Sequence, residues 1–169
     1  MIRLLCVALL VGFFWVGCAG YHVGSVAGKS LQGVNTITVP VAKNESYEPG
    51  IQVTVTNEIL RRLDDDGTLK TIQSGADSEL TVTIKSVDRE SIRGNTLDPQ
   101  ATEEYELYLN AEVSFFNRKL GKKVLDKVKV QGSAKFFVQT NQVEAERQAV
   151  PLAAEDLANH IVSLVVEGW

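Results

Sequence analysis

The chain has 169 residues and a formal net charge of −4, and 44% of its residues are hydrophobic. That length and hydrophobic content suit a single domain that is large enough to bury a core. The acidic balance argues against nucleic acid as a partner, because phosphate neutralisation requires clustered lysine and arginine.

The chain begins with a short apolar stretch that ends at Cys18. Residues 4–16 are almost continuously apolar, and the small residue Gly17 stands directly before the cysteine. The stretch is shorter than the roughly 20 residues of a membrane-spanning helix, so it is typical of a secretory signal peptide. A small residue before a cysteine resembles a bacterial lipoprotein signal, although Trp15 stands where leucine is commonest. We therefore predict a signal peptide over residues 1–17 and a lipid on the Cys18 sulfur. The alternative is an ordinary secreted protein with an incidental cysteine.

Lipidation of Cys18 would decide how the mature protein is held. Stable anchoring takes more than one acyl chain, so we expect covalent acyl and diacylglycerol groups on this residue and no other cofactor. Cys6 leaves with the signal peptide, so the mature monomer would contain no disulfide and its stability would come from packing. Residues 18–33 are rich in glycine and serine and are predicted to be a lipidated tether. Residues 34–169 are predicted to form a single domain.

The first half of the domain combines short strands with one helix. Residues 36–41 are β-branched and predict a strand, and residues 69–73 predict another. Between them, Pro49 suits the first position of a helix and Gly67 suits its end. Apolar residues with a spacing of four form one face of this helix: Ile51, Val55, Ile59 and Leu63.

Three longer strands follow. Residues 80–92 alternate between apolar and polar, and a break at Ser86 and Val87 indicates a bulge or a bend. Residues 105–115 and 124–136 also alternate, and their short connection predicts an antiparallel hairpin. On its polar side, lysines would face glutamates, and such opposite charges stabilise strand pairing.

From about Glu144 the chain is helical in composition. Pro151 either starts this helix near Val150 or kinks a longer helix in its early turns. Together the elements predict an α+β two-layer sandwich, with two amphipathic helices packed on one face of a mainly antiparallel four- to five-stranded sheet. The other face of the sheet would be left to solvent or to a partner.

Few residues are candidates for catalysis or for metal binding. His22 lies in the predicted tether, where no rigid geometry would hold it. His160 stands four residues after Asp156 on the predicted last helix, and we favour a solvated pair over an oriented base or a metal ligand. The run of three aspartates at 64–66 ends a helix and points in different directions, which argues against a metal site. We therefore predict no catalysis and no metal.

Basic side chains gather at two places. Arg89 and Arg93 lie towards the far end of the strand over residues 80–92, and whether they share an end of the sheet with the hairpin tip depends on the strand order. A basic tip can bind phosphates of a lipid or nucleic acid, although lysines also keep a turn soluble, which is the interpretation that we favour. The tip carries Arg118, Lys119, Lys122 and Lys123.

Several short motifs occur in a specific order. Residues 18–23 read Cys-Ala-Gly-Tyr-His-Val, directly behind the predicted signal. After them come Val39-Pro40-Val41, Asn44, Tyr47-Glu48-Pro49-Gly50, Ala76-Asp77, Glu104-Tyr105, Gly121-Lys122-Lys123-Val124-Leu125 and a closing alanine-rich helix. Each motif alone is weak, but together and in order they resemble the LptE family of lipopolysaccharide-assembly lipoproteins. The resemblance covers residues 18–169.

This resemblance implies an outer-membrane lipoprotein that faces the periplasm. It would sit as a plug inside the lumen of an LptD-type β-barrel, and the two proteins would insert lipopolysaccharide into the outer leaflet. Cys18 would hold the chain to the inner leaflet of the outer membrane, and Ala19, which is not aspartate, is compatible with outer-membrane sorting. Family members bind lipopolysaccharide through basic residues near the sheet. The candidates for this role here are Arg93, Lys122, Lys123 and Lys135.

Other classes of protein remain open. A lipid-anchored periplasmic adaptor of another envelope complex would have a different stoichiometric partner. A small-ligand carrier would need a large apolar cavity, although two helical stripes already match the apolar face of the sheet. An enzyme would need an oriented base, for which His160 is the candidate.

Overall fold

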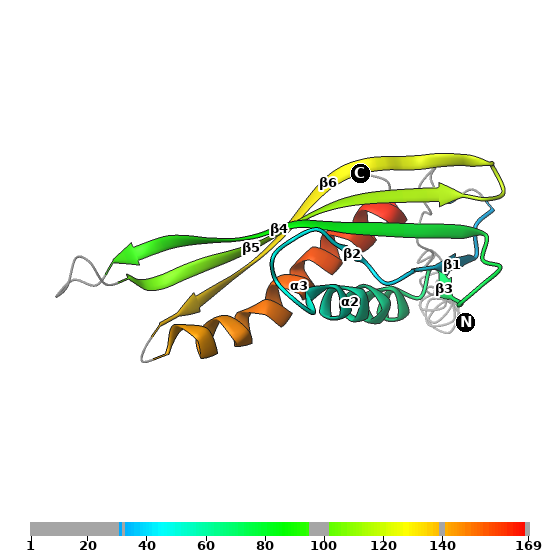
Figure 1. Cartoon of the computed structure of the whole chain (residues 1–169). Coiled ribbons are helices and arrows are strands. Elements are labelled where there is room, and N and C mark those ends of the chain that lie inside the picture. The colour runs from blue at the N-terminus through cyan, green and yellow to red at the C-terminus, as the bar shows by residue number, and fades with distance from the viewer. Residues whose placement is uncertain (1–30, 32, 95–101, 139–140, 168–169) are drawn as a thin grey trace, which may run out of the picture.

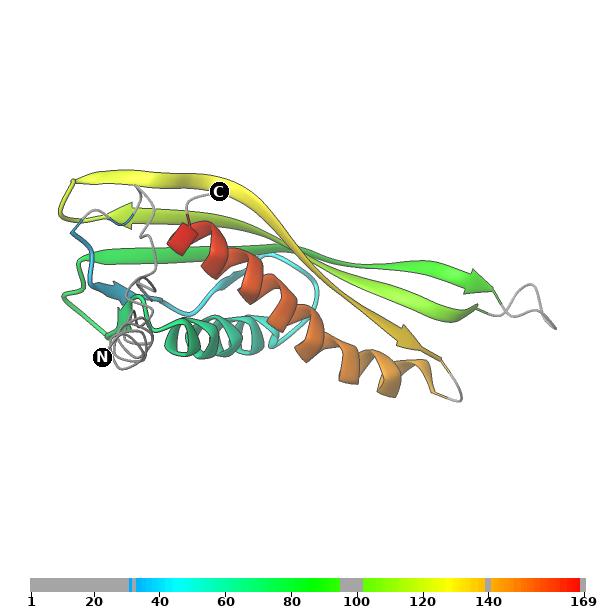
Figure 2. The same ribbon diagram turned by 180° about the vertical axis from the view of Figure 1, so that it is seen from behind.

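The computed structural model describes residues 31, 33–94, 102–138 and 141–167. Both helices lie on one side of the sheet (Figure 1, Figure 2), so the predicted two-layer α+β sandwich is confirmed. The predicted signal peptide, Cys18 and most of the predicted tether lie outside the described residues. The elements are, in chain order, β1 (Thr36–Thr38), β2 (Lys43–Asn44), α2 (Ile51–Asp66), β3 (Lys70–Thr71), β4 (Ser78–Gly94), β5 (Thr102–Asn117), β6 (Lys122–Phe137) and α3 (Gln142–Glu167).

The sheet has six strands of mixed direction. Its order is β3-β1-β4-β5-β6, and β2 pairs with β4 beside this path. The three long strands are antiparallel, whereas the short strands pair in parallel with β4 or with each other. The prediction of four to five mainly antiparallel strands was therefore slightly off in both respects. The reason is α2, which connects β1 to β3, because a strand–helix–strand connection within one sheet makes the two strands parallel.

The long strands follow the alternation that predicted them. The β5–β6 hairpin is antiparallel as expected. The predicted break in β4 is also present, as a register shift between Ile84 and Ser86 that leaves Lys85 as the additional residue. Further shifts lie towards the end of β4 and in the β5–β6 pairing, where Val113 pairs with Val128 but Phe115 pairs with Leu125. A bulge changes where a side chain points.

The two helices begin and end close to the predicted positions. Gly50 is the N-cap of α2, so Pro49 lies just outside the helix and not at its first position. At the other end, Gly67 adopts a φ of 70° and its N–H donates to the Leu63 carbonyl at 3.0 Å. Pro151 lies inside α3, which selects the longer of the two helices considered for the C-terminal segment.

The core lies between the sheet and the helices. Most of its largest fully buried side chains come from the helices and from the inner faces of β4 and β5, and Ile37 and Leu69 add to them. Each contributes about 1.5–3 kcal/mol through burial. By length and composition alone, α3 could cross a membrane. However, half of its most apolar stretch is buried in this core. The central members include Phe115, Leu107, Leu109, Ile59, Leu157 and Ile161.

Candidate functional site

The face of the sheet away from the helices is polar and open. On β5, the side chains that point towards the helices are buried. The side chains that alternate with them point to the open face and are half-exposed. The same alternation on β4 and β6 brings threonines, lysines and amides beside them. The β5 side chains on the open face are Glu106, Tyr108, Asn110, Glu112 and Ser114.

The bulge after Ile84 in β4 and the bulge opposite Ser114 in β6 each add a lysine at the open face. Lys85 is the additional residue of the β4 bulge. On β6, Lys127 adopts a φ of 52°, a left-handed conformation that non-glycine residues rarely take. Its backbone N–H donates to the Ser114 Oγ at 3.1 Å, which fixes the bulge against β5. The two lysines thus approach the same part of the open face from opposite sides of β5.

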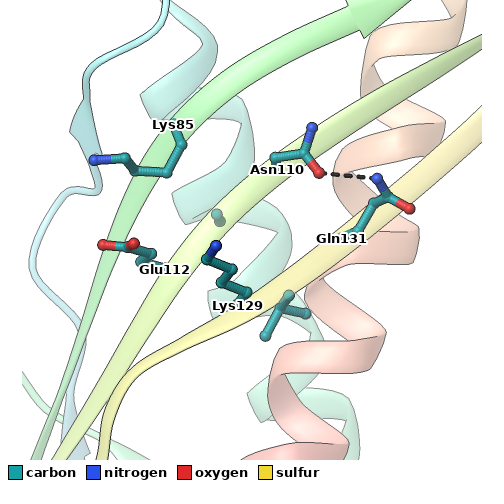
Figure 3. A pocket seen from close by; sticks show the side chains of 7 residues that line it. Lys85, Asn110, Glu112, Lys129 and Gln131 are labelled. Atoms are coloured by element: carbon teal, nitrogen blue, oxygen red, sulfur yellow. Dashed lines mark hydrogen bonds between the residues drawn. The ribbon is translucent and has the colours of Figure 1, made fainter.

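Two adjoining hollows lie over this part of the sheet and share Lys85 and Glu112. One has a volume of about 460 Å³, and the other has a volume of about 290 Å³. In Figure 3, Lys85, Glu112 and Lys129 rise from three neighbouring strands on the side away from the helices. We call the two hollows together the lysine hollow. Its four lysines are Lys43, Lys85, Lys127 and Lys129.

The charges in the lysine hollow are coupled. Lys85 forms an ion pair with Glu45, and this hydrogen bond is the main reason why the pKa of Glu45 is lowered. The charges of Lys43 and Lys127 lower the pKa of Glu45 further. Conversely, Glu45 and Glu112 raise the pKa of Lys85. The Glu45 carboxylate and the Lys85 ammonium therefore stay ionised at neutral pH.

Oriented amide groups adjoin the lysines. The Asn110 Nδ2 donates to the Ser86 Oγ at 3.1 Å and to the Asp88 Oδ2 at 2.7 Å. The Gln131 Nε2 donates to the Asn110 Oδ1 at 2.8 Å, as the dashed line in Figure 3 shows. These bonds hold both amides in place, and a polar ligand would meet fixed donors and acceptors.

The predicted lipopolysaccharide-contact residues lie at two opposite ends of the sheet. Arg93 pairs in register with Glu104, and Lys135 pairs with Glu106 close by, so these two cations share one end. Lys122 and Lys123 pair with Asn117 and Phe116 at the other end. At about 3.4 Å per residue, the two ends are roughly 40 Å apart. The four residues therefore do not form a single site, and their role in binding stays a prediction.

Most cations at the hairpin end already have acidic partners. Arg118 contacts Glu79 at 2.5 Å, and Lys119 contacts Asp77 at 3.2 Å. Lys123 contacts Asp126 at 3.0 Å. At the other end, the Arg93 Nε lies 3.8 Å from Glu104 and its side chain is 68% exposed, so this cation is the more available one.

His160 and Asp156 have partners on the backbone of β6. The His160 Nδ1 lies 2.7 Å from the Gln131 carbonyl, to which it donates. The Asp156 Oδ2 accepts from the Ser133 N–H at 2.9 Å. The predicted contact between the two side chains is loose, at 3.9 Å. Their arrangement suits the attachment of α3 to the edge of the sheet. His22 lies outside the described residues.

Among the residues that the structure describes, no three His, Cys, Asp or Glu side chains are grouped so that they could hold a metal ion. The lysine hollow was not predicted from the sequence. Alternation places Lys129 on the polar face, which is a usable signal. The contribution of Lys127 depends on a bulge, and that of Lys43 on the pairing of β2 with β4, neither of which a local pattern reveals.

The fold and the open face define a small α+β domain that leaves one polar sheet face available to a partner. Residues 34–165 match the model of a family described as "LptE: Lipopolysaccharide-assembly". The chain belongs to this family, as its motifs had predicted. It is accordingly a lipoprotein of the Gram-negative envelope with a role in lipopolysaccharide assembly.

Solved structures share the fold at low sequence identity. The hypothetical protein CT253 from Chlamydia trachomatis is 12% identical with a TM-score of 0.58, covering 78% of this chain and 95% of that one. A minor lipoprotein from Acinetobacter baumannii is 12% identical with a TM-score of 0.56, covering 80% of this chain and 95% of that one. No curated protein matches the chain by sequence.

Proposed function

We propose that this chain is an outer-membrane lipoprotein that plugs and supports an LptD-type β-barrel, and that the pair delivers lipopolysaccharide to the outer leaflet. The match to the lipopolysaccharide-assembly family over residues 34–165 is the observation that carries this proposal. A plug in the polar lumen of a barrel needs a polar surface, since lumen walls are polar. The open face of β4, β5 and β6 supplies such a surface.

The anchor in this proposal is the lipid on Cys18. Several acyl chains would hold the protein to the inner leaflet of the outer membrane, with the domain facing the periplasm. Basic residues of the sheet would contact the lipopolysaccharide phosphates, and the candidates at one end are Lys135 and the loosely paired Arg93, whose side chain is 68% exposed. The partners are thus the barrel, lipopolysaccharide and the membrane surface, and we propose no nucleic acid.

We also propose that the role is not enzymatic. The only histidine among the described residues, His160, donates through its Nδ1 to a backbone carbonyl of β6. Its neighbour Asp156 is bonded to a backbone N–H of the same strand. An arrangement that attaches a helix to a sheet edge supports a structural role for this pair. A His160→Ala variant should accordingly retain lipopolysaccharide delivery if it remains folded.

The test is a pull-down. A tag at the C-terminus, mild detergent and identification of what co-purifies from outer membranes would show the partner and its stoichiometry. A large β-barrel protein recovered at one to one is the expected result. A stable complex without a barrel would leave the fold and the anchor standing but would favour an adaptor of another envelope complex, and the plug role would be withdrawn.

A Cys18→Ser variant is the matched control for the anchor. If the lipid on Cys18 holds the protein, this variant should be recovered in the soluble periplasmic fraction or with its signal peptide uncleaved. Metabolic labelling with a radioactive or clickable fatty acid should mark the parent and not the variant. Equal labelling of both would show that the lipid is elsewhere.

A further inference from the structure

The outer edge of β4, on the side away from β5, is paired only along its first part. There β1 pairs with Ser78 and Glu79, and β2 pairs with Thr83 and Ile84. In the described part of the chain, no strand lies beside this edge over residues 85–94. Figures 1 and 2 show this part of β4 as the outer margin of the sheet. At about 3.4 Å per residue the free edge is roughly 30 Å long, and such an edge is a template for pairing with another chain.

The pairing of β4 with β5 shows which backbone groups point to the free edge. The Ile84 carbonyl points to the outer side, because it accepts from the Glu45 N–H at 2.9 Å. After the bulge, Val87 and Arg89 face β5 residues that alternate regularly with the partner of Ile84. Since backbone groups alternate along a strand, Val87 and Arg89 also direct their N–H and C=O groups outward. The free edge therefore offers donors and acceptors in the pattern that an added strand needs.

The side chains of this edge are acidic on the open face. Asp88 and Glu90 pair in register with Tyr108 and Glu106, which point to that face. Glu90 thus lies opposite a second carboxylate, and like charges in this arrangement oppose each other. The hydrogen bond to Glu106 is the main reason why the pKa of Tyr108 is raised, and the charge of Glu90 adds to it. Within the described ranges, Asp88 and Glu90 form no ion pair, so a cation from outside would find both carboxylates available.

Exposed side chains stand at the beginning and near the end of the free edge. A hollow of about 250 Å³ lies between residues 46–48 and residues 85–89. Tyr47 borders this hollow and is fully exposed. Near the other end, Ile92 is 44% exposed. Aromatic side chains are common anchors of protein interfaces, so Tyr47 is placed to contact a chain that runs along the edge.

We propose that residues 86–92 of β4 bind an extended, basic segment of a partner protein, which adds a strand to the sheet. The segment pairs its backbone with Val87 and Arg89, and its lysine or arginine side chains lie opposite Asp88 and Glu90. A second copy of this chain fits less well. Antiparallel pairing of two copies about Arg89 would place Asp88 of one copy opposite Glu90 of the other, and these like charges repel. The acidic charge likewise disfavours a lipid phosphate at this edge.

The experiment is a peptide titration of the full-length protein in detergent micelles, followed by NMR of the backbone amides. The probe is a short peptide with blocked ends in which lysine and valine alternate, and its charge control has glutamate in place of lysine. The lysine peptide should shift the amide signals of residues 86–92. It should also slow hydrogen exchange of the Val87 and Arg89 N–H groups, because these groups would donate to it. The glutamate peptide should bind at least about tenfold more weakly.

Two methylated forms of the lysine peptide separate strand pairing from attraction between charges. In the added strand, the valines would lie opposite Val87 and Arg89, so their N–H groups would point to β4 and those of the lysines to solvent. Methylation of the valine amides should therefore weaken binding by about tenfold or more. Methylation of the lysine amides gives a peptide of the same composition and should leave binding nearly unchanged.

The decisive protein variant is Asp88→Asn/Glu90→Gln, which removes two charges and keeps the shapes of the side chains. Its affinity for the lysine peptide should fall by about tenfold or more, because two attractive cross-strand pairs are lost. The control is Asp64→Asn/Asp65→Asn, which removes the same charge from the end of α2. This control should bind like the parent protein, and circular dichroism would verify that both variants are folded.

Several results would overturn the proposal. Equal binding of the two methylated peptides would mean attraction between charges without strand pairing, and an equal loss in the two double variants would mean a general effect of net charge. No binding of the lysine peptide at about 1 mM, or amide shifts confined to other elements, would show that the edge accepts no such strand. Slow exchange of Val87 and Arg89 without peptide, together with a dimer in analytical ultracentrifugation, would assign the edge to a second copy. Because the titration contains no barrel, its failure is separate from a failure of the pull-down.

Discussion

At Gly132 the backbone of β6 comes closer to α3 than any side chain permits. A Cβ at this position would lie 2.3 Å from the Leu157 nitrogen and 2.6 Å from the Ala153 carbonyl oxygen. These are backbone atoms of a packed helix, so they cannot turn away. Replacement by alanine must therefore move α3 away from the sheet or distort β6.

We expect Gly132→Ala to lower the free energy of unfolding by roughly 3 kcal/mol, as overpacking of a core does. Gly121→Ala is the control, because a Cβ there meets nothing within 4 Å and only its φ of 61° is unfavourable. That control should cost about 1 kcal/mol. Urea unfolding followed by circular dichroism measures both values. Equal losses in the two variants would refute a close approach of α3 at Gly132.

The residue scale is where prediction from the sequence is least complete. Alternation correctly places Gly132 on the inner face of β6, but the need for glycine arises from α3, which follows later in the chain. The positive φ of Lys127 likewise depends on how β6 pairs with Val113 and Phe115 of β5. Such features depend on contacts between distant segments, and no local pattern contains them.

At the scale of elements, Asp77 connects the beginning of β1 to the beginning of β4. Its Oδ2 accepts from the Asn35 N–H at 3.0 Å and from the Thr36 N–H at 3.2 Å. Lys119, at 3.2 Å, adds an ion pair. The backbone donor of Asn35 is the largest of the influences that lower the pKa of Asp77 below its ordinary value, and Lys119 and Thr36 add to it.

This lowered pKa predicts a pH dependence of stability. The folded state binds the Asp77 proton more weakly than the unfolded state, so its contribution is fully present above the ordinary aspartate pKa and is lost as the pH falls through the lower, folded value. Below about pH 4 the free energy of unfolding should therefore fall, and Asp77→Asn should remove part of that dependence. Unfolding curves between pH 7 and pH 2 measure the effect. The control Asp64→Asn, on the exposed side of α2, should leave the profile unchanged.

Arg89 joins β4 to α3 and to the loop before α2. Its Nη2 donates to the Glu48 Oε2 at 2.9 Å and also to Glu146 on α3. The two carboxylates raise the pKa of the arginine. The Glu146 side chain is only 17% exposed, so loss of its partner would leave a largely buried charge.

We expect Arg89→Gln to lower the free energy of unfolding by about 1–3 kcal/mol and to speed hydrogen exchange in the first turns of α3. Arg147→Gln is the control, because Arg147 pairs with Glu144 on the same exposed helix surface. Such a surface pair contributes about 0.5 kcal/mol. If the two variants lost equal stability and α3 exchanged at its original rate, the attachment by Arg89 would be unimportant.

The same scale shows what patterns in the sequence do capture. The three long strands and both helices were predicted because each repeats its period over many residues. The short strands have only two or three residues each, too few to display a period. Strands were nevertheless predicted over residues 36–41 and 69–73, where β1 and β3 lie, whereas β2 was not predicted. Their parallel pairing follows from the path of α2, and so the mixed character of the sheet was missed. For the candidate site residues, the sequence predicted which lie on the polar face and which lie at the strand ends. Which of them lie close together depends on the strand order, which the sequence did not predict.

At the scale of the whole molecule, the two ends of the sheet differ in how much free positive charge they offer. Three of the four cations around the β5–β6 hairpin have acidic partners at 2.5–3.2 Å. At the opposite end, Arg93 is loosely paired, and two apolar side chains lie exposed near it: Ile92 at 44% and Phe137 at 59%. A cation beside exposed apolar groups suits a phosphate that carries acyl chains.

We therefore expect the charge reversal Arg93→Glu/Lys135→Glu to weaken lipopolysaccharide binding by about tenfold or more, because it replaces two attractive contacts with repulsive ones. The matched reversal Lys122→Glu/Lys123→Glu introduces the same charge roughly 40 Å away and should change binding by less than about threefold. Binding of purified, detergent-solubilised protein to immobilised lipopolysaccharide measures both. Unchanged binding after the hairpin reversal would exclude the hairpin tip as a competitor for lipopolysaccharide phosphates. An equal loss in both variants would instead indicate that net charge, and not a site at one end of the sheet, controls the interaction.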